Sequence, residues 1–215
     1  MFANVPALHA ELLGREPDAF VSQYLFESVP QIFRGSLPNW VEWKQQLSDL
    51  IEVDSRDIVL TGSAAIGFSL NPKKGFKAFD DSSDIDCGII SPYHFEQAWR
   101  YLRKQRVVWM SLPRSTKSAI HDHRTRHVFS GAIATDWMLS ILPFGSAWQS
   151  ALELMSEIEP TKGRDVKLRI YKDFESLRHY QSSNIDRLRV AIQADTGDDE
   201  TDIPITQSDD MEVIQ

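Results

Sequence analysis

The chain has 215 residues, of which 42% are hydrophobic and 25% charged, and its formal net charge is −8. This length and composition are typical of one globular core, and no apolar run approaches the roughly eighteen residues of a membrane span. The single cysteine, Cys87, excludes an intrachain disulfide framework. Since the N-terminus also lacks a basic stretch followed by an apolar one, we expect a cytoplasmic protein.

The charges are unevenly distributed along the chain. Residues 195–215 contain eight acids and no Lys or Arg, which leaves 23 acidic and 23 basic residues in the rest of the chain. Residues 100–127 contain eight Lys or Arg and one acid, Asp122. This basic stretch predicts either a polyanionic partner or a plain solvated surface, and the acidic end predicts a disordered tail.

Helical spacing of apolar residues dominates both ends of the chain. Several of these segments have a proline near their start, and Ser91 followed by Pro92 is a typical N-cap and first turn. Asn39 is a plausible N-cap of another helix. The expected helices cover 5–15, 16–29, 39–53, 91–106, 146–158 and 172–194.

Short apolar runs between these helices predict strands. A loop rich in Gly, Pro and Lys at 70–83 separates the first two. The expected strands are 57–61, 84–90, 107–112 and 165–171, with one or two more in 127–142.

These elements predict an α+β fold with a small mixed sheet flanked by N- and C-terminal helices. The expected organisation is an N-terminal helical segment (1–54), a sheet-containing core (55–143), a C-terminal helical segment (144–194) and an acidic tail (195–215).

Gly62 and Ser63 follow the first strand and predict a tight turn into a helix. Glycine allows a ligand to approach the backbone closely, and Ser63 can cap the helix or donate to a phosphate. Gly62 and Gly67 have the spacing of a P-loop, but Phe68 and Ser69 follow Gly67 where Lys and Ser/Thr are required. A P-loop NTPase is therefore excluded.

Asp84 and Asp86 begin the second strand. Residues two apart on a strand face the same side, so both carboxylates point together while Ile85 and Cys87 point away. Adjacent carboxylates repel one another without a cation, and such oxygen ligands suit Mg²⁺. The alternative is that both serve as loop and cap residues at a strand edge.

Asp136 interrupts an apolar, strand-like run in "IATDWMLSIL". An unpaired carboxylate is costly there, so the residue needs a partner, a metal or a hairpin turn. If its strand lies beside the 84–90 strand, three carboxylates could converge on two ions.

His121, His123 and His127 would share one face of an extended segment. They could form a metal site, part of a basic phosphate-facing strand, or a plain surface strand.

In chain order, Gly62-Ser63, Asp84-Ile85-Asp86 and Asp136 resemble the pattern of the DNA polymerase β-like nucleotidyltransferase superfamily, over residues 55–143. The resemblance implies that Gly62 and Ser63 hold the phosphates of an NTP such as ATP. It further implies that Asp84 and Asp86 bind two Mg²⁺ (or Mn²⁺) ions, and that Asp136 ligates the catalytic ion and helps to deprotonate the attacking hydroxyl.

The loop before Asp84 is longer than in the shortest members of that superfamily. It carries Lys73, Lys74 and Lys77, which could contact the triphosphate or the acceptor, or be merely exposed.

The resemblance implies an enzyme that transfers a nucleoside monophosphate to a nucleotide, RNA or protein acceptor and releases pyrophosphate. The basic 100–127 stretch is a candidate acceptor surface, and antiviral defence or a toxin–antitoxin pair is the expected setting. The alternative is an inactive module of the same fold that binds a nucleotide, RNA or a protein partner.

Overall fold

The structure is a computed structural model that describes residues 2–71, 74–105, 114, 117–118, 121, 123–135 and 138–197. For Arg124, Arg126 and residues 195–197 it describes only the backbone. Helices and a four-stranded sheet make up the fold, which confirms the predicted α+β class. The helical elements before the sheet are α1 (Val5–Gly14), α2 (Pro17–Val21), η1 (Ser22–Phe26), η2 (Gln31–Phe33), α3 (Leu37–Ile51) and η3 (Ser55–Asp57).

The remaining elements alternate strands with helices. They are β1 (Ile58–Thr61), α4 (Gly62–Ile66), β2 (Ile85–Ile90), α5 (Pro92–Lys104), η5 (His123–Val128), β3 (Ala132–Ala134), η6 (Leu139–Ile141), α8 (Gly145–Met155), β4 (Val166–Tyr171) and α9 (Phe174–Gly197).

The strands of the sheet lie in the order β1-β2-β4-β3. The β1–β2 and β4–β3 pairs are antiparallel, whereas β2 and β4 are parallel, so the sheet is mixed as predicted. In the register of the two central strands, Asp86 pairs with Lys167 and Gly88 with Arg169. β4, the last strand in the sequence, therefore lies in the interior of the sheet, directly beside β2.

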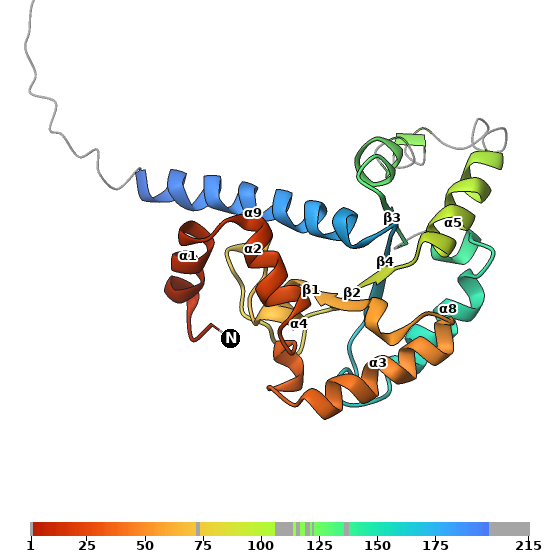
Figure 1. Cartoon of the computed structure of the whole chain (residues 1–215), viewed down its shortest axis with the longest axis horizontal. Coiled ribbons are helices and arrows are strands. Elements are labelled where there is room, and N and C mark those ends of the chain that lie inside the picture. Colours follow the sequence, from red (N-terminus) through yellow and green to blue (C-terminus); the bar gives the residue numbers. More distant parts are fainter. Residues whose placement is uncertain are drawn as a thin grey trace, which may run out of the picture.

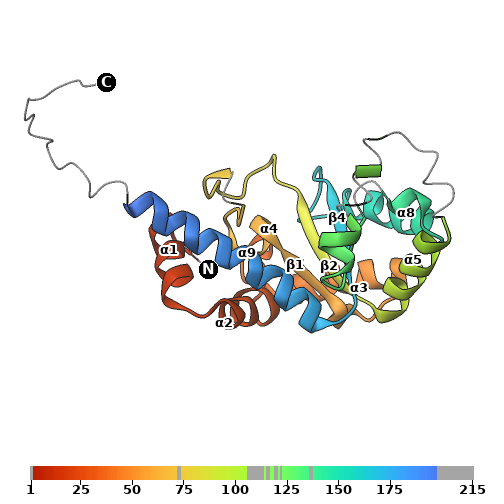
Figure 2. The ribbon, with the colours of Figure 1, turned by 90° about the horizontal axis from the view of Figure 1, so that it is seen from above.

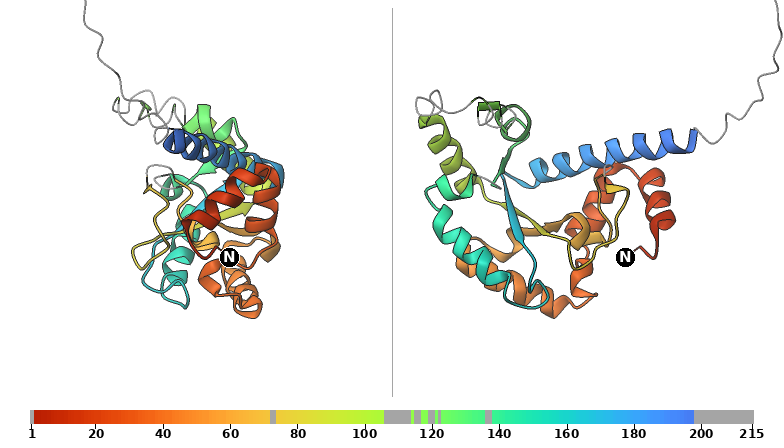
Figure 3. Two further views of the ribbon diagram at one scale, coloured as in Figure 1. Left: turned by 90° about the vertical axis from the view of Figure 1, so that its left-hand side faces the viewer. Right: turned by 180° about the vertical axis from the view of Figure 1, so that it is seen from behind.

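Helices cover the two faces of the sheet (Figure 1). The long α9 runs along one side, with α1 and α2 against it, and α3 and α8 lie on the other side, as the view from behind also shows (Figure 3). Seen from above, α9 passes over the strands (Figure 2), and it contacts both β2 and β4. A Cβ atom on Gly88 would lie 2.7 Å from Leu177 Cδ1, so this glycine allows α9 to approach the sheet closely.

Alternation along the central strands separates the core from the α9 side of the sheet. Ile85, Cys87 and Ile89 on β2 are at most 2% exposed and join the hydrophobic core. Their neighbours along the strand, Asp86 and Gly88, face α9 instead. This alternation places Asp86 on the α9 face of the sheet, where a cavity is open.

Several predicted boundaries need correction. The N-cap of α3 is Ser36, whose hydroxyl accepts from the backbone N–H of Asn39, so Asn39 is not the cap. Ser91 caps α5 as predicted, with Pro92 in its first turn. The predicted strand at 107–112 lies outside the described residues.

The segment around His123 and His127 is not extended as the shared-face interpretation requires. It forms the π-helical turn η5. The side chain of His123 is 6% exposed, and its Nε2 accepts from the backbone N–H of Ala134 at 3.0 Å. His123 therefore holds the end of β3 through a hydrogen bond that needs the neutral imidazole. The interpretations of this segment as a basic, metal-binding or plain surface strand are therefore wrong.

Candidate functional site

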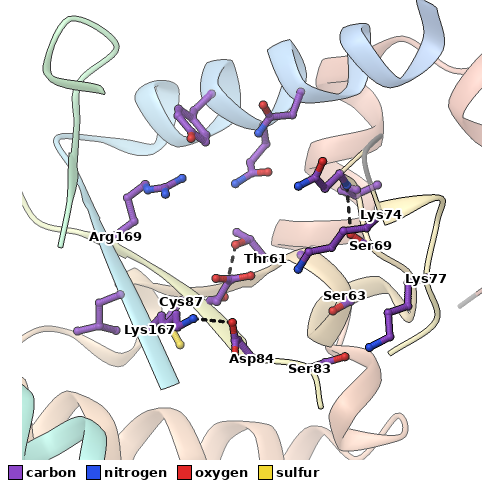
Figure 4. Close-up of a pocket in the computed structure, with 18 of the residues that line it drawn as sticks. Thr61, Ser63, Ser69, Lys74, Lys77, Ser83, Asp84, Cys87, Lys167 and Arg169 are labelled. Carbon is purple, nitrogen blue, oxygen red and sulfur yellow. Dashed lines mark hydrogen bonds and ion pairs between the residues drawn. The ribbon is translucent and has the colours of Figure 1, made fainter. Parts of the chain in front are cut away.

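A cavity of about 600 Å³ opens on the α9 side of the sheet, within the size range of small-molecule sites. Its walls come from the β1–α4 junction, the loop before β2, the strands β2 and β4, and the helix α9 (Figure 4). Five of the site residues predicted from the sequence line it together: Gly62, Ser63, Lys74, Asp84 and Asp86.

Gly62 lies at the turn from β1 into α4, as predicted. Its φ of +64° belongs to the left-handed region that favours glycine. A Cβ atom at this position would lie 2.9 Å from Asp86 Oδ2, so the missing side chain leaves room for that carboxylate. Thr61, the preceding residue, pairs with Asp86 across β1 and β2, and its hydroxyl donates to the Asp86 carbonyl at 3.4 Å.

Asp84 and Asp86 face the cavity, while Ile85 and Cys87 between and after them are buried. The predicted alternation is therefore confirmed. Burial raises the pKa of the Cys87 thiol well above its ordinary value, and the nearby Asp86 charge raises it further. Cys87 is thus a protonated core residue.

Lys167 on β4 faces the cavity beside both aspartates. Its ammonium lies 2.5 Å from Asp84 Oδ2, and both side chains are partly exposed, at 43% for Lys167 and 38% for Asp84 (Figure 4). The hydrogen bond to Asp84 raises the pKa of Lys167 above its ordinary value, and the charges of Asp84, Asp86 and Asp165 add to this effect. Lys167 therefore partly neutralises the carboxylate pair.

Arg169, two residues further along β4, also lines the cavity. Its guanidinium carbon lies 4.8 Å from the ring centroid of Tyr180 on α9, a cation–π contact. Tyr171 beside it is 1% exposed, and burial raises its pKa to about 12. The Tyr180 ring thus contacts the Arg169 guanidinium where it lines the cavity.

The helix α9 contributes the wall opposite the sheet. Its cavity-lining residues Gln181, Asn184 and Arg187 recur at a spacing that places them on one face of the helix. Gln181 is only 6% exposed, although it is polar. Ile185 and Leu188, further along the same helix, are buried in the core.

The loop before β2 brings two of the predicted lysines to the cavity. Lys74 and Lys77 both line it, whereas Lys73 lies outside the described residues. The Lys77 ammonium contacts Asp80 Oδ2 at 2.9 Å and donates to Ser82 Oγ at 2.7 Å. These contacts join Lys77, which lines the cavity, to Asp80 and Ser82 further along the same loop.

Arg164 fixes the same loop from the other side. Its guanidinium donates to the Asp80 carbonyl and to Asp81 Oδ1, the latter at 2.8 Å, and lies 4.7 Å from the ring centroid of Phe79. The backbone carbonyl of the adjoining residue, Asp165, accepts from the backbone N–H of Ile85 at 2.8 Å. The segment before β4 therefore determines where the chain enters β2 and where Asp84 lies.

Asp136 lies outside the described residues, so its predicted place beside Asp84 and Asp86 stays a prediction. The strand that precedes it, β3, is not the neighbour of β2, because β4 lies between them. The residue paired with Asp86 on the adjacent strand is Lys167. β3 therefore does not meet the condition that the strand leading to Asp136 lies directly beside the strand of Asp84 and Asp86.

For a divalent cation, the described site offers two carboxylates. Over the described ranges, no group of three or more His, Cys, Asp or Glu side chains could hold a metal ion. Mg²⁺ often binds one or two carboxylates and completes its shell with water and substrate phosphates. Asp84 and Asp86 therefore fit Mg²⁺ when a phosphate group supplies further oxygens.

No protein-family model, curated protein or solved structure matches this chain.

The basic 100–127 stretch contributes no described residue to the cavity lining. On α5, Arg100 pairs with Glu96, and the Arg103 guanidinium carbon lies 4.3 Å from the ring centroid of Trp99. Most of residues 106–122 lie outside the described ranges. None of the helices that the structure describes is long and apolar enough to span a membrane.

Proposed function

We propose that this chain is a metal-dependent nucleotidyltransferase that moves a nucleoside monophosphate from an NTP to an acceptor hydroxyl. The observation that carries the proposal is that Gly62, Ser63, Asp84 and Asp86 line one cavity together with several lysines and arginines. The Gly-Ser turn and the paired carboxylates are twenty-one residues apart in sequence between Ser63 and Asp84. Their meeting in one cavity is what the resemblance requires.

The charges in the cavity favour a polyphosphate. Two carboxylates and five basic side chains line it, the latter being Lys74, Lys77, Lys167, Arg169 and Arg187. Basic groups around a cavity raise the local concentration of anions and contact phosphate oxygens directly. A cationic substrate, such as an aminoglycoside, would be repelled.

Each side of the cavity has a separate task in this proposal. Gly62 allows the phosphates to approach the backbone, and Ser63, Lys74 and Lys77 donate to phosphate oxygens. Asp84 and Asp86 would hold Mg²⁺ or Mn²⁺, which when bound stabilises the negative charge of the phosphates and of the leaving group.

In the transfer step, the acceptor oxygen attacks the α-phosphorus in line with the leaving group. The new acceptor oxygen–phosphorus bond forms as the bond from the α-phosphorus to the bridging oxygen breaks, and pyrophosphate leaves with that electron pair. The acceptor proton passes to a carboxylate, for which we propose Asp136, as the resemblance implies. The acceptor is a nucleotide, an RNA or a protein, and bacterial antiviral defence or a toxin–antitoxin pair is the proposed setting.

A second candidate function is a nucleotide-binding module without transfer activity. It is favoured by Lys167, which lies on the strand next to Asp86 and neutralises Asp84. A site of this kind would bind the same phosphates but would lack a third carboxylate beside the other two.

Label transfer separates the two functions. The protein is incubated with Mg²⁺ and each α-³²P-labelled NTP, alone, with RNA and with cell lysate, and parallel reactions contain the γ-labelled NTP. Nucleotidyl transfer predicts that α-label enters a product while γ-label is released as pyrophosphate, and that Asp84→Asn and Asp136→Asn both abolish the product. Tight NTP binding with no transfer to any acceptor would favour the binding module, and transfer that survives both substitutions would refute the proposed site.

A further inference from the structure

Lys167 is a cavity residue whose positive charge lies directly against a candidate cation ligand. Lys167 lies on β4, the strand that pairs with β2 in parallel. Its ammonium lies 2.5 Å from Asp84 Oδ2. A divalent cation bound by Asp84 needs the same carboxylate oxygens. Lys167 and the cation therefore compete for Asp84.

The contact between Lys167 and Asp84 is suited to exchange. Both side chains are about two-fifths exposed, and ion pairs with this exposure are weak because water screens the two charges. Lysine carries a compact charge on a flexible four-carbon chain, which can turn from one acceptor to another. Arg169, by contrast, is packed against the Tyr180 ring at 4.8 Å and presents its guanidinium from a fixed position.

We propose that Lys167 is an exchangeable counter-ion that couples cation binding to phosphate binding at this site. This inference rests on the proposed function, because it assumes that the cavity binds the phosphates of an NTP. Without a phosphate, Lys167 pairs with Asp84 and weakens the binding of a free divalent cation. When a phosphate enters, Lys167 turns to its oxygens and Asp84 is released for the cation.

The exchange follows from the charges in the cavity. A triphosphate offers an ammonium several anionic oxygens, whereas Asp84 offers a single carboxylate that the incoming cation also attracts. Coupling between two ligands is reciprocal, so the phosphate favours the cation by the same factor by which the cation favours the phosphate. The site then selects the cation–nucleotide complex over either component alone.

The inference predicts that removing the ammonium changes the two affinities in opposite directions. In Lys167→Met, Asp84 is no longer paired with Lys167, so Mn²⁺ should bind about five- to tenfold more tightly in the absence of nucleotide. The same variant loses a phosphate contact, so α,β-methylene-ATP in EDTA should bind about five- to tenfold more weakly. A purely structural role for Lys167 would weaken both or neither.

Two further variants serve as controls. Lys172→Met removes an exposed lysine just beyond the end of β4, outside the residues that line the cavity, and should leave both affinities unchanged. Lys167→Arg keeps the positive charge beside Asp84, so its Mn²⁺ affinity should stay as low as that of the unmodified protein. Circular dichroism and urea unfolding confirm that each variant is folded.

The experiment measures Mn²⁺ binding from the electron paramagnetic resonance signal of free Mn²⁺, and nucleotide binding by isothermal titration calorimetry in EDTA. Opposite shifts in Lys167→Met, absent in Lys172→Met, support the inference. If the unmodified protein binds both ligands and Lys167→Met shifts the two affinities in the same direction or not at all, this inference alone fails. If the unmodified protein binds no nucleotide with or without Mn²⁺, both the proposed function and this inference fail.

Discussion

Asp86 Oδ2 lies 2.9 Å from the position that a Cβ atom on Gly62 would occupy. The Asp86 carboxylate therefore takes up the space that a side chain at Gly62 would need, although twenty-three residues lie between Gly62 and Asp86 in the sequence. Because Gly62 also has a φ of +64°, both its backbone conformation and its missing side chain are required.

Gly62→Ala should damage both stability and ligand binding. The left-handed backbone costs a non-glycine residue about 1–2 kcal/mol, and the new methyl group would displace the Asp86 carboxylate. Urea unfolding measures the first effect, and calorimetry with a metal–nucleotide analogue measures the second.

Gly35→Ala is the matched control for that substitution. Gly35 has a φ of +81° but nothing within 4 Å of its added Cβ atom. The free energy of unfolding of Gly35→Ala should fall by an amount similar to that in Gly62→Ala, while its nucleotide affinity should not change. Equal nucleotide affinity in the two variants would contradict a role for the Gly62–Asp86 approach in binding.

Arg164→Met should loosen the loop that leads into Asp84. The Arg164 side chain is only 13% exposed, and its guanidinium holds the loop through Asp80 and Asp81. Hydrogen bonds to charged groups contribute about 1.5–3 kcal/mol to the free energy of unfolding. We expect faster hydrogen exchange of the amides in residues 79–85 and several-fold weaker nucleotide binding. Lys162→Met, at an exposed residue of the same segment, should change neither, and unchanged exchange in Arg164→Met would contradict the anchoring role.

The buried imidazole of His123 should make the folded chain less stable at acidic pH. Burial, helped by the charges of His127 and Arg169, lowers the pKa of His123 in the folded chain to about 4, below its ordinary value of 6.5. The unfolded chain therefore binds more protons between these values, so the stabilisation is complete above pH 6.5 and is lost as the pH falls towards 4. The total is of the order of 3 kcal/mol.

The measurement is the urea midpoint at pH 7 and pH 5 for the unmodified chain and for His123→Gln. Glutamine can accept from the Ala134 N–H through its side-chain oxygen, yet it does not titrate. The unmodified chain should lose more stability between the two pH values than the variant. The same loss in both would show that other groups cause the pH dependence.

A buried hydrogen bond joins the N-terminal helices to the segment before β4. The indole N–H of Trp43 donates to Thr161 Oγ1 at 3.0 Å, and Thr161 is 0% exposed. Thr161→Val keeps the shape but leaves the indole unpaired, so the free energy of unfolding should fall by about 1–3 kcal/mol. Thr161→Ser should retain most of the stability in the same urea titration, and a fully stable valine variant would be inconsistent with this bond.

Local patterns in the sequence predict one half of the site. The glycine before a short helix and the alternation of Asp84, Ile85, Asp86 and Cys87 depend only on neighbouring residues, and the structure confirms both. The strand that the sequence predicts at 165–171 is present as β4 (Val166–Tyr171). Its alternating Lys167 and Arg169 are the signal that could have located the second half.

What the local pattern could not predict is the position of β4 in the sheet. A parallel connection between β2 and β4 spans a long stretch of chain, and its partner is decided by tertiary packing. For this reason Lys167, and not the residue from the strand before Asp136, is paired with Asp86. The extended interpretation around His123 failed for a related reason, because the imidazole is used to accept a distant backbone N–H.

The central claim is that Asp86 and its cavity bind a metal–nucleotide complex, and equilibrium binding tests it most directly. Calorimetry with Mg²⁺ and non-hydrolysable analogues of the four NTPs compares the unmodified chain with Asp86→Asn and with Asp49→Asn, which alters an exposed aspartate on α3. We predict saturable binding of at least one analogue, weakened at least about tenfold in Asp86→Asn, a difference of about 1.4 kcal/mol, and unchanged in Asp49→Asn. No binding of any analogue, or equal affinity in all three proteins, would contradict the account.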